Sequence, residues 1–293
     1  MTPTFLTTSA LGKKRRRKDS IFKAICAIAA LTAVSILVVL IAKVIMDGIG
    51  RVSLQFITSM PSQMFPSKAG ILGPLVGSLL VMVLTILFVV PVGVAAAIYL
   101  EEFTPKKNAF IRFIQVNISN LAGVPSIVFG MLGLAVFVTM MGLGKSVLTG
   151  ALTMSILVLP MVILVTQEAL KAVPKAYREA SLALGTTQWQ TIRRAVLPSA
   201  LPGILTGIIL AASRAIGETA PLIVVGAVGY LNFVPAKLDD KYTVLPLQIL
   251  DWIGQPRQDF RIGAAAAILV LMAMLLILNS AAIIIRARAL KKV

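Results

Sequence analysis

The 293-residue sequence contains no histidine and only one cysteine, Cys26. Without histidine, imidazole can provide neither acid–base catalysis nor zinc coordination. One cysteine cannot form a disulfide within the chain. Charged residues are also scarce, at 13%. What remains is apolar and basic, with 58% hydrophobic residues, a mean hydropathy of +0.95 and a net charge of +17. This composition predicts one all-α polytopic membrane protein, without a metal or another cofactor.

Six apolar runs are long enough to cross about 30 Å of hydrocarbon, which takes about 20 helical residues. They cover residues 21–46, 71–100, 124–141, 147–170, 202–228 and 262–285. The first run follows the basic stretch KKRRRK, but it is longer than the core of a signal peptide and no clean cleavage site follows it. We therefore expect six transmembrane helices.

Basic residues in the connecting segments predict the orientation of the chain. If the N-terminus lies inside, the inner segments hold 19 lysines and arginines and the outer segments hold seven. Both termini are then cytoplasmic, and the protein is a multi-pass protein of the inner (plasma) membrane. The positive charge is explained by this topology and by attraction to anionic membrane lipids, so nucleic-acid binding is not expected.

The predicted organisation follows from these spans. Residues 1–20 form a basic cytoplasmic tail, and 21–69 form the first span with an outer segment. Residues 70–286 form a core of five spans that includes a polar cytoplasmic segment at 171–200, and 287–293 form a second cytoplasmic tail. The outer segment 229–261 has balanced charge and is expected to be a solvated loop, with docking of a binding protein as the alternative.

The polar segment at 171–200 has the pattern of two short helices joined by a corner. Pro174 can open the first helix, and Gly185 suits a left-handed C-terminal stop. One face of this helix would carry Tyr177, Ala180, Ser181 and Leu184. Arg178, Arg193 and Arg194 would occupy the remaining faces of the pair.

The second helix of this pair begins with the spacing of a capping box. Thr187 and Gln190 are three residues apart, and Trp189, Ile192 and Val196 share one face of the helix. Leu197 and Pro198 are expected to end the helix before the next span. The pattern fits either a protein-docking knob or a helix pair that lies on lipid headgroups.

Within this segment, EASLALG, nine further residues and AVLP resemble the EAA loop of ABC-importer permeases. Ser181 replaces the second alanine of that pattern and Ala195 replaces its isoleucine. The resemblance implies a type I importer permease whose loop is a coupling helix, docked in a groove of a cytoplasmic ATPase dimer. It assigns ATPase coupling to the matching residues Glu179, Ala180, Gly185, Leu197 and Pro198, and the helical faces add Tyr177 and Trp189 to this set.

Two further stretches narrow the resemblance. LAGVPSIVFGMLGL at 121–134 and SRAIGETAPLIVVGA at 213–227 are similar to the phosphate-specific permease pair, and YTVLPLQILDWI is closer to its PstA member than to PstC. The resemblance covers about residues 70–290. It implies phosphate as substrate, a second PstC-like permease subunit and an extracytoplasmic phosphate-binding protein as partners, and ATP hydrolysis on separate subunits rather than on this chain.

Arg214 falls near the middle of the fifth predicted span, where an unpaired charge costs at least about 2.5 to 3.5 kcal/mol. Glu218 lies four residues later on the same helical face, where it can pair with Arg214. Pro221 is expected to bend this helix. We interpret the pair as part of a substrate pathway, in which Arg214 meets the anion and Glu218 limits how tightly it is held. A purely structural ion pair is the alternative.

Two other transport functions remain alternatives, and one nucleotide-binding motif is discounted. A permease for another oxyanion, such as sulfate or molybdate, would show the same pattern. An ion-coupled secondary transporter is a more distant alternative, because it gives no reason for a capped cytoplasmic knob. GLGKS at 142–146 resembles the end of a phosphate-binding loop, but its first glycine is missing and no strand precedes it, so it is interpreted as a hairpin turn.

Overall fold

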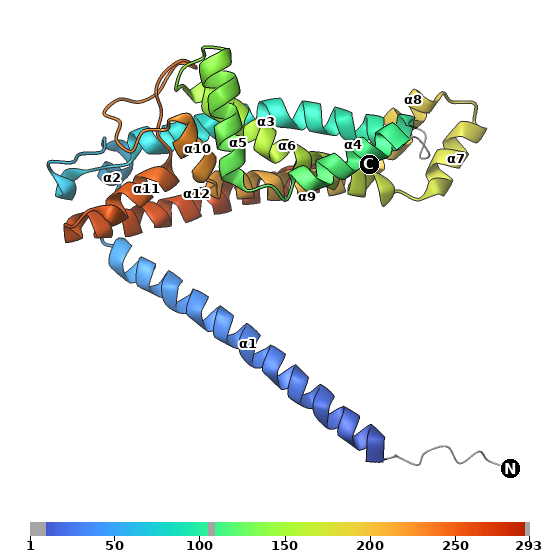
Figure 1. The fold of residues 1–293 in the computed structure, drawn as a ribbon, viewed down its shortest axis with the longest axis horizontal. Helices are drawn as coiled ribbons and strands as arrows, with labels where there is room; N and C mark the ends of the chain where they lie inside the picture. The colour runs from blue at the N-terminus through green and yellow to red at the C-terminus, as the bar shows by residue number, and fades with distance from the viewer. Residues whose placement is uncertain (1–9, 105–108, 291–293) are drawn as a thin grey trace.

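The computed structural model describes residues 10–104 and 109–290, and in these residues all regular structure is helical (Figure 1). The long apolar helices are α1 (Ala10–Gly48), α3 (Leu72–Ile98), α6 (Val147–Lys171), α9 (Leu197–Gly217) and α12 (Gln258–Leu290). Three π-helical turns extend or precede other helices, namely η2 (Tyr99–Phe103), η3 (Leu134–Met140) and η4 (Ile192–Val196).

Shorter helices connect the long ones. On the N-terminal side these are α2 (Leu54–Thr58), the 3₁₀ turn η1 (Pro66–Lys68), α4 (Ala109–Leu121) and α5 (Ser126–Gly133). Further along the chain they are α7 (Lys175–Ala183), α8 (Gln188–Thr191), α10 (Ala220–Val225) and α11 (Leu245–Gly254). Figure 1 shows α3, α6, α9 and α12 running along one bundle, with α7 and α8 at one end of it.

Five helices of the described residues are long and apolar enough to cross a membrane, and a sixth span results if the bent pair α4 and α5–η3 is counted as one. This agrees with the six predicted spans. The predicted third span, 124–141, corresponds to α5 and η3, which run on from one another as one helix over Ser126–Met140. At 1.5 Å per residue this helix rises about 22 Å, which is shorter than the hydrocarbon core of a typical bilayer.

The interruption between α4 and α5 has a local cause. The two helices meet at an angle of 105° across residues 122–125. Pro125 has no N–H to donate and disfavours a helical backbone at Val124, so the helix that ends at Leu121 restarts only at Ser126. The break lies at the edge of the predicted span 124–141, and irregular backbone within a membrane is tolerated only against protein or a cavity.

The fifth span begins earlier than the sequence predicts. Leu197 and Pro198 do not end the second helix of the polar segment, since α8, η4 and α9 form one helix over Gln188–Gly217. The Leu197 N–H donates to the Ile192 carbonyl, five residues back, and this wide turn precedes Pro198 in the first turn of α9. The altered register accommodates a proline that an ordinary α-helical turn would exclude.

Close packing of α6 against α9 forms much of the core. A Cβ atom added at Gly207 of α9 would lie 2.6 Å from the Cβ of Val165, and one added at Gly203 would lie 2.9 Å from the Cβ of Ala169. Small residues at this four-residue spacing allow two membrane helices to approach closely. Gly203 and Gly207 therefore allow the close contact between α6 and α9.

The outer segment 229–261 is not a solvated loop, because much of it is buried. Tyr242, Leu245 and Gln248 have no exposed surface, and the Leu245 N–H donates to the Ser78 hydroxyl of α3 at 2.7 Å. Trp252 of α11 packs between the rings of Phe56 and Phe260. The segment therefore closes one end of the bundle. By contrast, α1 leaves the bundle with its apolar surface exposed (Figure 1).

Candidate functional site

A cavity of about 590 Å³ lies where two helices are interrupted. Its wall includes the break between α4 and α5, one face of α6 and the end of α9. Most of its lining is apolar, but three charged residues contribute to it, namely Glu168, Arg214 and Glu218. The two predicted pathway residues therefore lie at the same cavity as the LAGVPS stretch, although about 90 residues separate them along the chain.

The predicted ion pair between Arg214 and Glu218 is present. Nε of Arg214 lies 3.7 Å from Oε1 of Glu218. The two residues do not share a helical face as expected, because α9 ends at Gly217 and Glu218 has an extended backbone. The chain turns into α10 with Pro221 in its first turn, so the interruption predicted from Pro221 begins three residues before the proline.

Exposure differs between the two partners of this ion pair. The Arg214 side chain is 62% exposed in the isolated chain, whereas the Glu218 side chain is 23% exposed. Glu218 is the one polar partner of Arg214 among the described residues. The guanidinium has five N–H donors in a planar fork, so a contact through Nε leaves its terminal nitrogens able to bind an oxyanion.

Glu168 is a cavity residue that the sequence reasoning missed. It lies near the cytoplasmic end of α6 by the predicted topology, is exposed, and faces the same cavity as Arg214. An acidic residue within an apolar run is itself a signal of function, because its burial in lipid is costly. That signal was available at 147–170, where Glu168 is the one charged residue.

The first helix of the polar segment has the predicted form. Pro174 precedes α7, which covers Lys175–Ala183, and Gly185 follows with φ of +77°. This left-handed conformation confirms the predicted glycine stop. Tyr177, Glu179 and Ala180 are all exposed, so α7 presents an apolar and acidic surface that no other part of the described chain covers.

Ser181, which departs from the EAA pattern, holds the corner between the two helices. Its hydroxyl lies 2.9 Å from that of Thr186 and 3.1 Å from that of Thr191, and the two threonine hydroxyls lie 2.8 Å apart. The three side chains link α7, the turn after Gly185 and α8. A serine at this position therefore stabilises the turn directly.

The second helix begins with the predicted capping box. The Thr187 hydroxyl accepts from the Gln190 N–H at 3.3 Å, and the Gln190 side chain accepts from the Thr187 N–H at 2.9 Å. Trp189 is 54% exposed, and its ring centroid lies 6.4 Å from that of Phe103 in η2. Leu197 and Pro198 are half-buried within the continuous helix rather than at its end.

Comparison with known proteins assigns these features to a family. Residues 89–291 match the family described as "Binding-protein-dependent transport system inner membrane component". The chain is 33% identical over 272 residues to the phosphate transport system permease protein PstA of Xylella fastidiosa, covering 92% of each protein. It is also 37% identical over 209 residues to a probable ABC transporter permease of Bacillus subtilis, covering 71% of this chain and 70% of that protein.

Solved structures show the same fold at low sequence identity. A bacterial ABC transporter involved in the import of alginate is similar with a TM-score of 0.65 and 15% identity, covering 95% of this chain and 98% of that chain. The MetNI methionine ABC transporter in an inward-facing conformation is similar with a TM-score of 0.60 and 17% identity. The alignment covers 73% of this chain and 94% of that chain. With the family match over 89–291, these findings show that the chain belongs to the binding-protein-dependent transport system inner membrane components, the multi-pass permease subunits of ABC transporters.

Proposed function

We propose that the chain is the permease subunit through which an ABC importer moves inorganic phosphate across the inner membrane. ATP hydrolysis takes place on a separate cytoplasmic ATPase dimer, and this chain contributes no catalytic residue. The relatives named as phosphate transport permeases support this assignment, since one of them aligns with 92% of the chain. The observation that carries it is the exposed Arg214 at a cavity between interrupted helices.

Arg214 is suited to a transient contact with phosphate. Its guanidinium can bind two oxygens of an oxyanion in parallel, and it stays charged at any physiological pH. Glu218 at 3.7 Å lowers the net positive charge that the anion meets. A translocation pathway needs such weakening, because a substrate bound too tightly does not leave. Glu168 on the opposite helix adds a second carboxylate to the same cavity.

The two-helix knob formed by α7 and α8 is proposed as the surface that docks on the ATPase. Tyr177 and Trp189 are each more than half exposed, and Leu184 is 85% exposed beside them. Apolar side chains of this size on a polar cytoplasmic segment are typical of a protein interface. Glu179 and Ala180 lie on the same exposed helix, and Gly185 sets the angle between the two helices.

The remaining partners follow from the topology. With both termini cytoplasmic, the knob faces the ATPase and the outer segment 229–261 faces an extracytoplasmic phosphate-binding protein. A second, PstC-like permease subunit completes the pathway. The exposed apolar helix α1 contacts membrane lipids and leaves the bundle, which gives it room to pass beside that second subunit.

Uptake with competing anions tests the proposal. The complete transporter, containing this chain and its partner subunits, is placed in vesicles with the phosphate-binding protein and ATP. Labelled phosphate should accumulate, excess sulfate or molybdate should leave its uptake unchanged, and the ATPase should co-purify with the chain in detergent. Inhibition by sulfate or molybdate, with uptake of that anion, would assign the chain to another oxyanion. Accumulation without an associated ATPase would indicate an ion-coupled transporter.

A further inference from the structure

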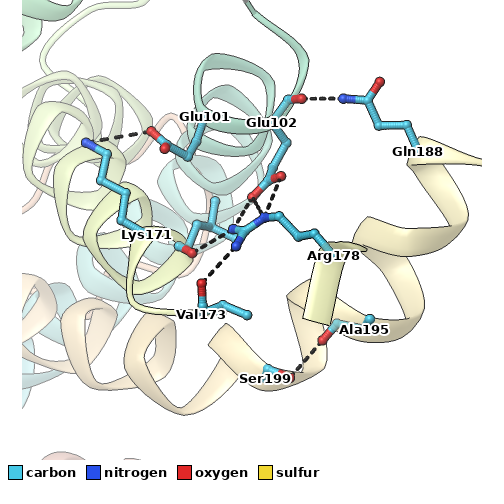
Figure 2. A network of polar contacts seen from close by, with 9 residues as sticks. Glu101, Glu102, Lys171, Val173, Arg178, Gln188, Ala195 and Ser199 are labelled. Atoms are coloured by element: carbon cyan, nitrogen blue, oxygen red, sulfur yellow. Dashed lines mark hydrogen bonds and ion pairs between the residues drawn. The ribbon is translucent and has the colours of Figure 1, made fainter. Parts of the chain in front are cut away.

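Arg178 of α7 joins three separate parts of the chain (Figure 2). Its Nη2 donates to Oε1 of Glu102 at 2.6 Å, and its Nε donates to Oε2 of the same carboxylate at 3.2 Å. Nη2 also donates to the Leu170 carbonyl at 2.9 Å, and Nη1 donates to the Val173 carbonyl at 2.8 Å. Glu102 belongs to η2 at the end of α3, whereas Leu170 and Val173 lie at the end of α6.

These contacts use the particular shape of arginine. A planar fork with five donors reaches a carboxylate and two carbonyls at once, which the single ammonium group of lysine cannot do with the same geometry. The carbonyls belong to the last turn of α6 and to the second residue after it, where the helix dipole favours a positive charge. Arg178 therefore caps α6 while it pairs with Glu102.

The pair is shielded from solvent. The Glu102 side chain is 9% exposed and the Arg178 side chain is 22% exposed. Removing one partner of such a pair leaves the other charge buried without compensation. Separating the two side chains is therefore costly. The neighbouring pair of Lys171 and Glu101 is different, because its atoms lie 3.6 Å apart and the Lys171 side chain is 55% exposed.

The second helix of the knob is attached at the same place. The Gln188 side-chain amide donates to the backbone carbonyl of Glu102, and the Trp189 ring packs against the Phe103 ring with centroids 6.4 Å apart. Both α7 and α8 are thus fixed to two consecutive residues of η2. A displacement of the knob therefore acts directly on the end of α3, in addition to its contact with the end of α6 through Arg178 and its continuation into α9.

The same joint leads to the candidate substrate cavity. Arg178 binds the carbonyl of Leu170, and Glu168, two residues earlier on α6, lines the cavity with Arg214. The cavity wall also includes Leu157, Val158 and Met161 from the same helix. Pro160 interrupts the hydrogen-bond ladder of α6, but the part of the helix after it carries Met161 and Glu168 and ends at Lys171, so a movement at that end reaches the cavity wall within one short helical segment.

We infer that the Glu102–Arg178 ion pair, with the carbonyls of Leu170 and Val173, is the joint that transmits movement of the α7–α8 knob to α3, α6 and the cavity. The inference rests on the proposed docking of the knob on an ATPase. Arg178 is a positioning residue in this account and contacts neither the substrate nor the nucleotide. The sequence placed Arg178 on an outer face of the helix pair, but its side chain is only 22% exposed and is held by Glu102 and two backbone carbonyls.

A nucleotide-dependent labelling experiment tests the joint without using phosphate. In the complete transporter, Cys26 is replaced by serine and Ser126, at the cavity wall, is replaced by cysteine. The rate of alkylation of that cysteine by a membrane-impermeant maleimide is measured with and without a non-hydrolysable ATP analogue. In the otherwise native chain the rate should change with nucleotide. In Glu102→Gln and in Arg178→Lys the rates with and without nucleotide should become equal, while the ATPase still co-purifies.

The control is Lys171→Gln, which removes the longer neighbouring contact from a lysine that is 55% exposed and should keep the nucleotide-dependent change. A change that survives in both Glu102→Gln and Arg178→Lys would overturn the joint, as would the absence of any change in the native chain. Loss of the ATPase from either variant would also overturn it, because the pair would then serve docking rather than transmission. Failure of the native complex to take up phosphate would contradict the proposed substrate and leave the labelling result standing.

Discussion

The hydroxyl of Ser213 and the side-chain oxygen of Asn279 lie 2.5 Å apart, which joins α9 to α12 one residue before Arg214. Hydrogen bonds between membrane helices fix the rotation of one helix against the other. The direction in which Arg214 points from α9 is therefore set partly by a residue 65 positions away.

Replacing Asn279 with leucine should lower the stability of the transporter by about 0.6 to 2 kcal/mol, the range measured for such bonds. Uptake should fall by a few-fold because α9 is free to rotate and Arg214 leaves the cavity wall for part of the time. Thermal unfolding in detergent and uptake in vesicles provide the two readouts. Ser280→Leu, an exposed change at the next position of α12, should alter neither, and an unaffected Asn279→Leu variant would remove this contact from the account.

The corner at Gly185 should be sensitive to a branched side chain. Its φ of +77° disfavours a valine by roughly 1 to 2 kcal/mol, although the space around it is open. Gly185→Val should therefore misplace α8 and Trp189, so ATPase co-purification or transport falls while membrane insertion remains. Gly185→Asn, which tolerates the left-handed conformation better, should retain most activity. Normal transport and normal ATPase binding in the valine variant would contradict this prediction.

The contact between α6 and α9 should not accept a larger residue at Gly207. Gly207→Ala places a methyl group 2.6 Å from the Cβ and Cγ2 atoms of Val165, and overpacking of this kind costs about 1 to 3 kcal/mol. The unfolding temperature of the purified transporter should fall accordingly. Gly254→Ala is a suitable comparison, because nothing lies within 4 Å of its added atom and its unfolding temperature should hardly change. Equal values for the two variants would contradict the close packing.

Orientation can be tested with fused reporters. A reporter after Val293 and one within 101–108 should both report the cytoplasm, whereas one near Asp239 should report the outer side. The reason is the excess of basic residues, with 19 in the proposed inner segments and seven in the outer ones. A cytoplasmic signal at Asp239 would mean that a span has been counted wrongly.

Much of this fold could be predicted because hydropathy, helix caps and glycine stops depend on residues that are close together in the chain. Hydropathy located five spans as single helices, and the Thr187–Gln190 capping box and the Gly185 stop follow from neighbouring backbone groups. The continuous helix through Pro198 could not be predicted in this way. It depends on a change of hydrogen-bond register at Ile192, which hydropathy does not reveal.

Tertiary contacts account for the other differences. Arg178 and Glu102 are 76 residues apart, so nothing in the local pattern distinguished Arg178 from the exposed Arg193 and Arg194. Tyr242 and Trp252 are buried only because α3, α6 and α12 supply their surroundings. The cavity was predicted in part, since Arg214 and Glu218 were found as charges within an apolar run, and Glu168 could have been found by the same test.

The central claim is that Arg214 serves the transported anion rather than the scaffold. Each single change, Arg214→Leu or Glu218→Met, should damage transport, because it leaves one charge uncompensated in a membrane setting. The double variant removes both charges. Since Arg214 is 62% exposed and an exposed ion pair contributes little to stability, the double variant should assemble and bind the ATPase.

The most direct measurement is phosphate uptake by this assembled double variant, normalised to the amount of complex in the membrane. If Arg214 meets phosphate in the cavity that it lines with Glu218, the double variant should hydrolyse ATP and move almost no phosphate. Near-normal uptake would contradict the account and assign Arg214 and Glu218 to the scaffold.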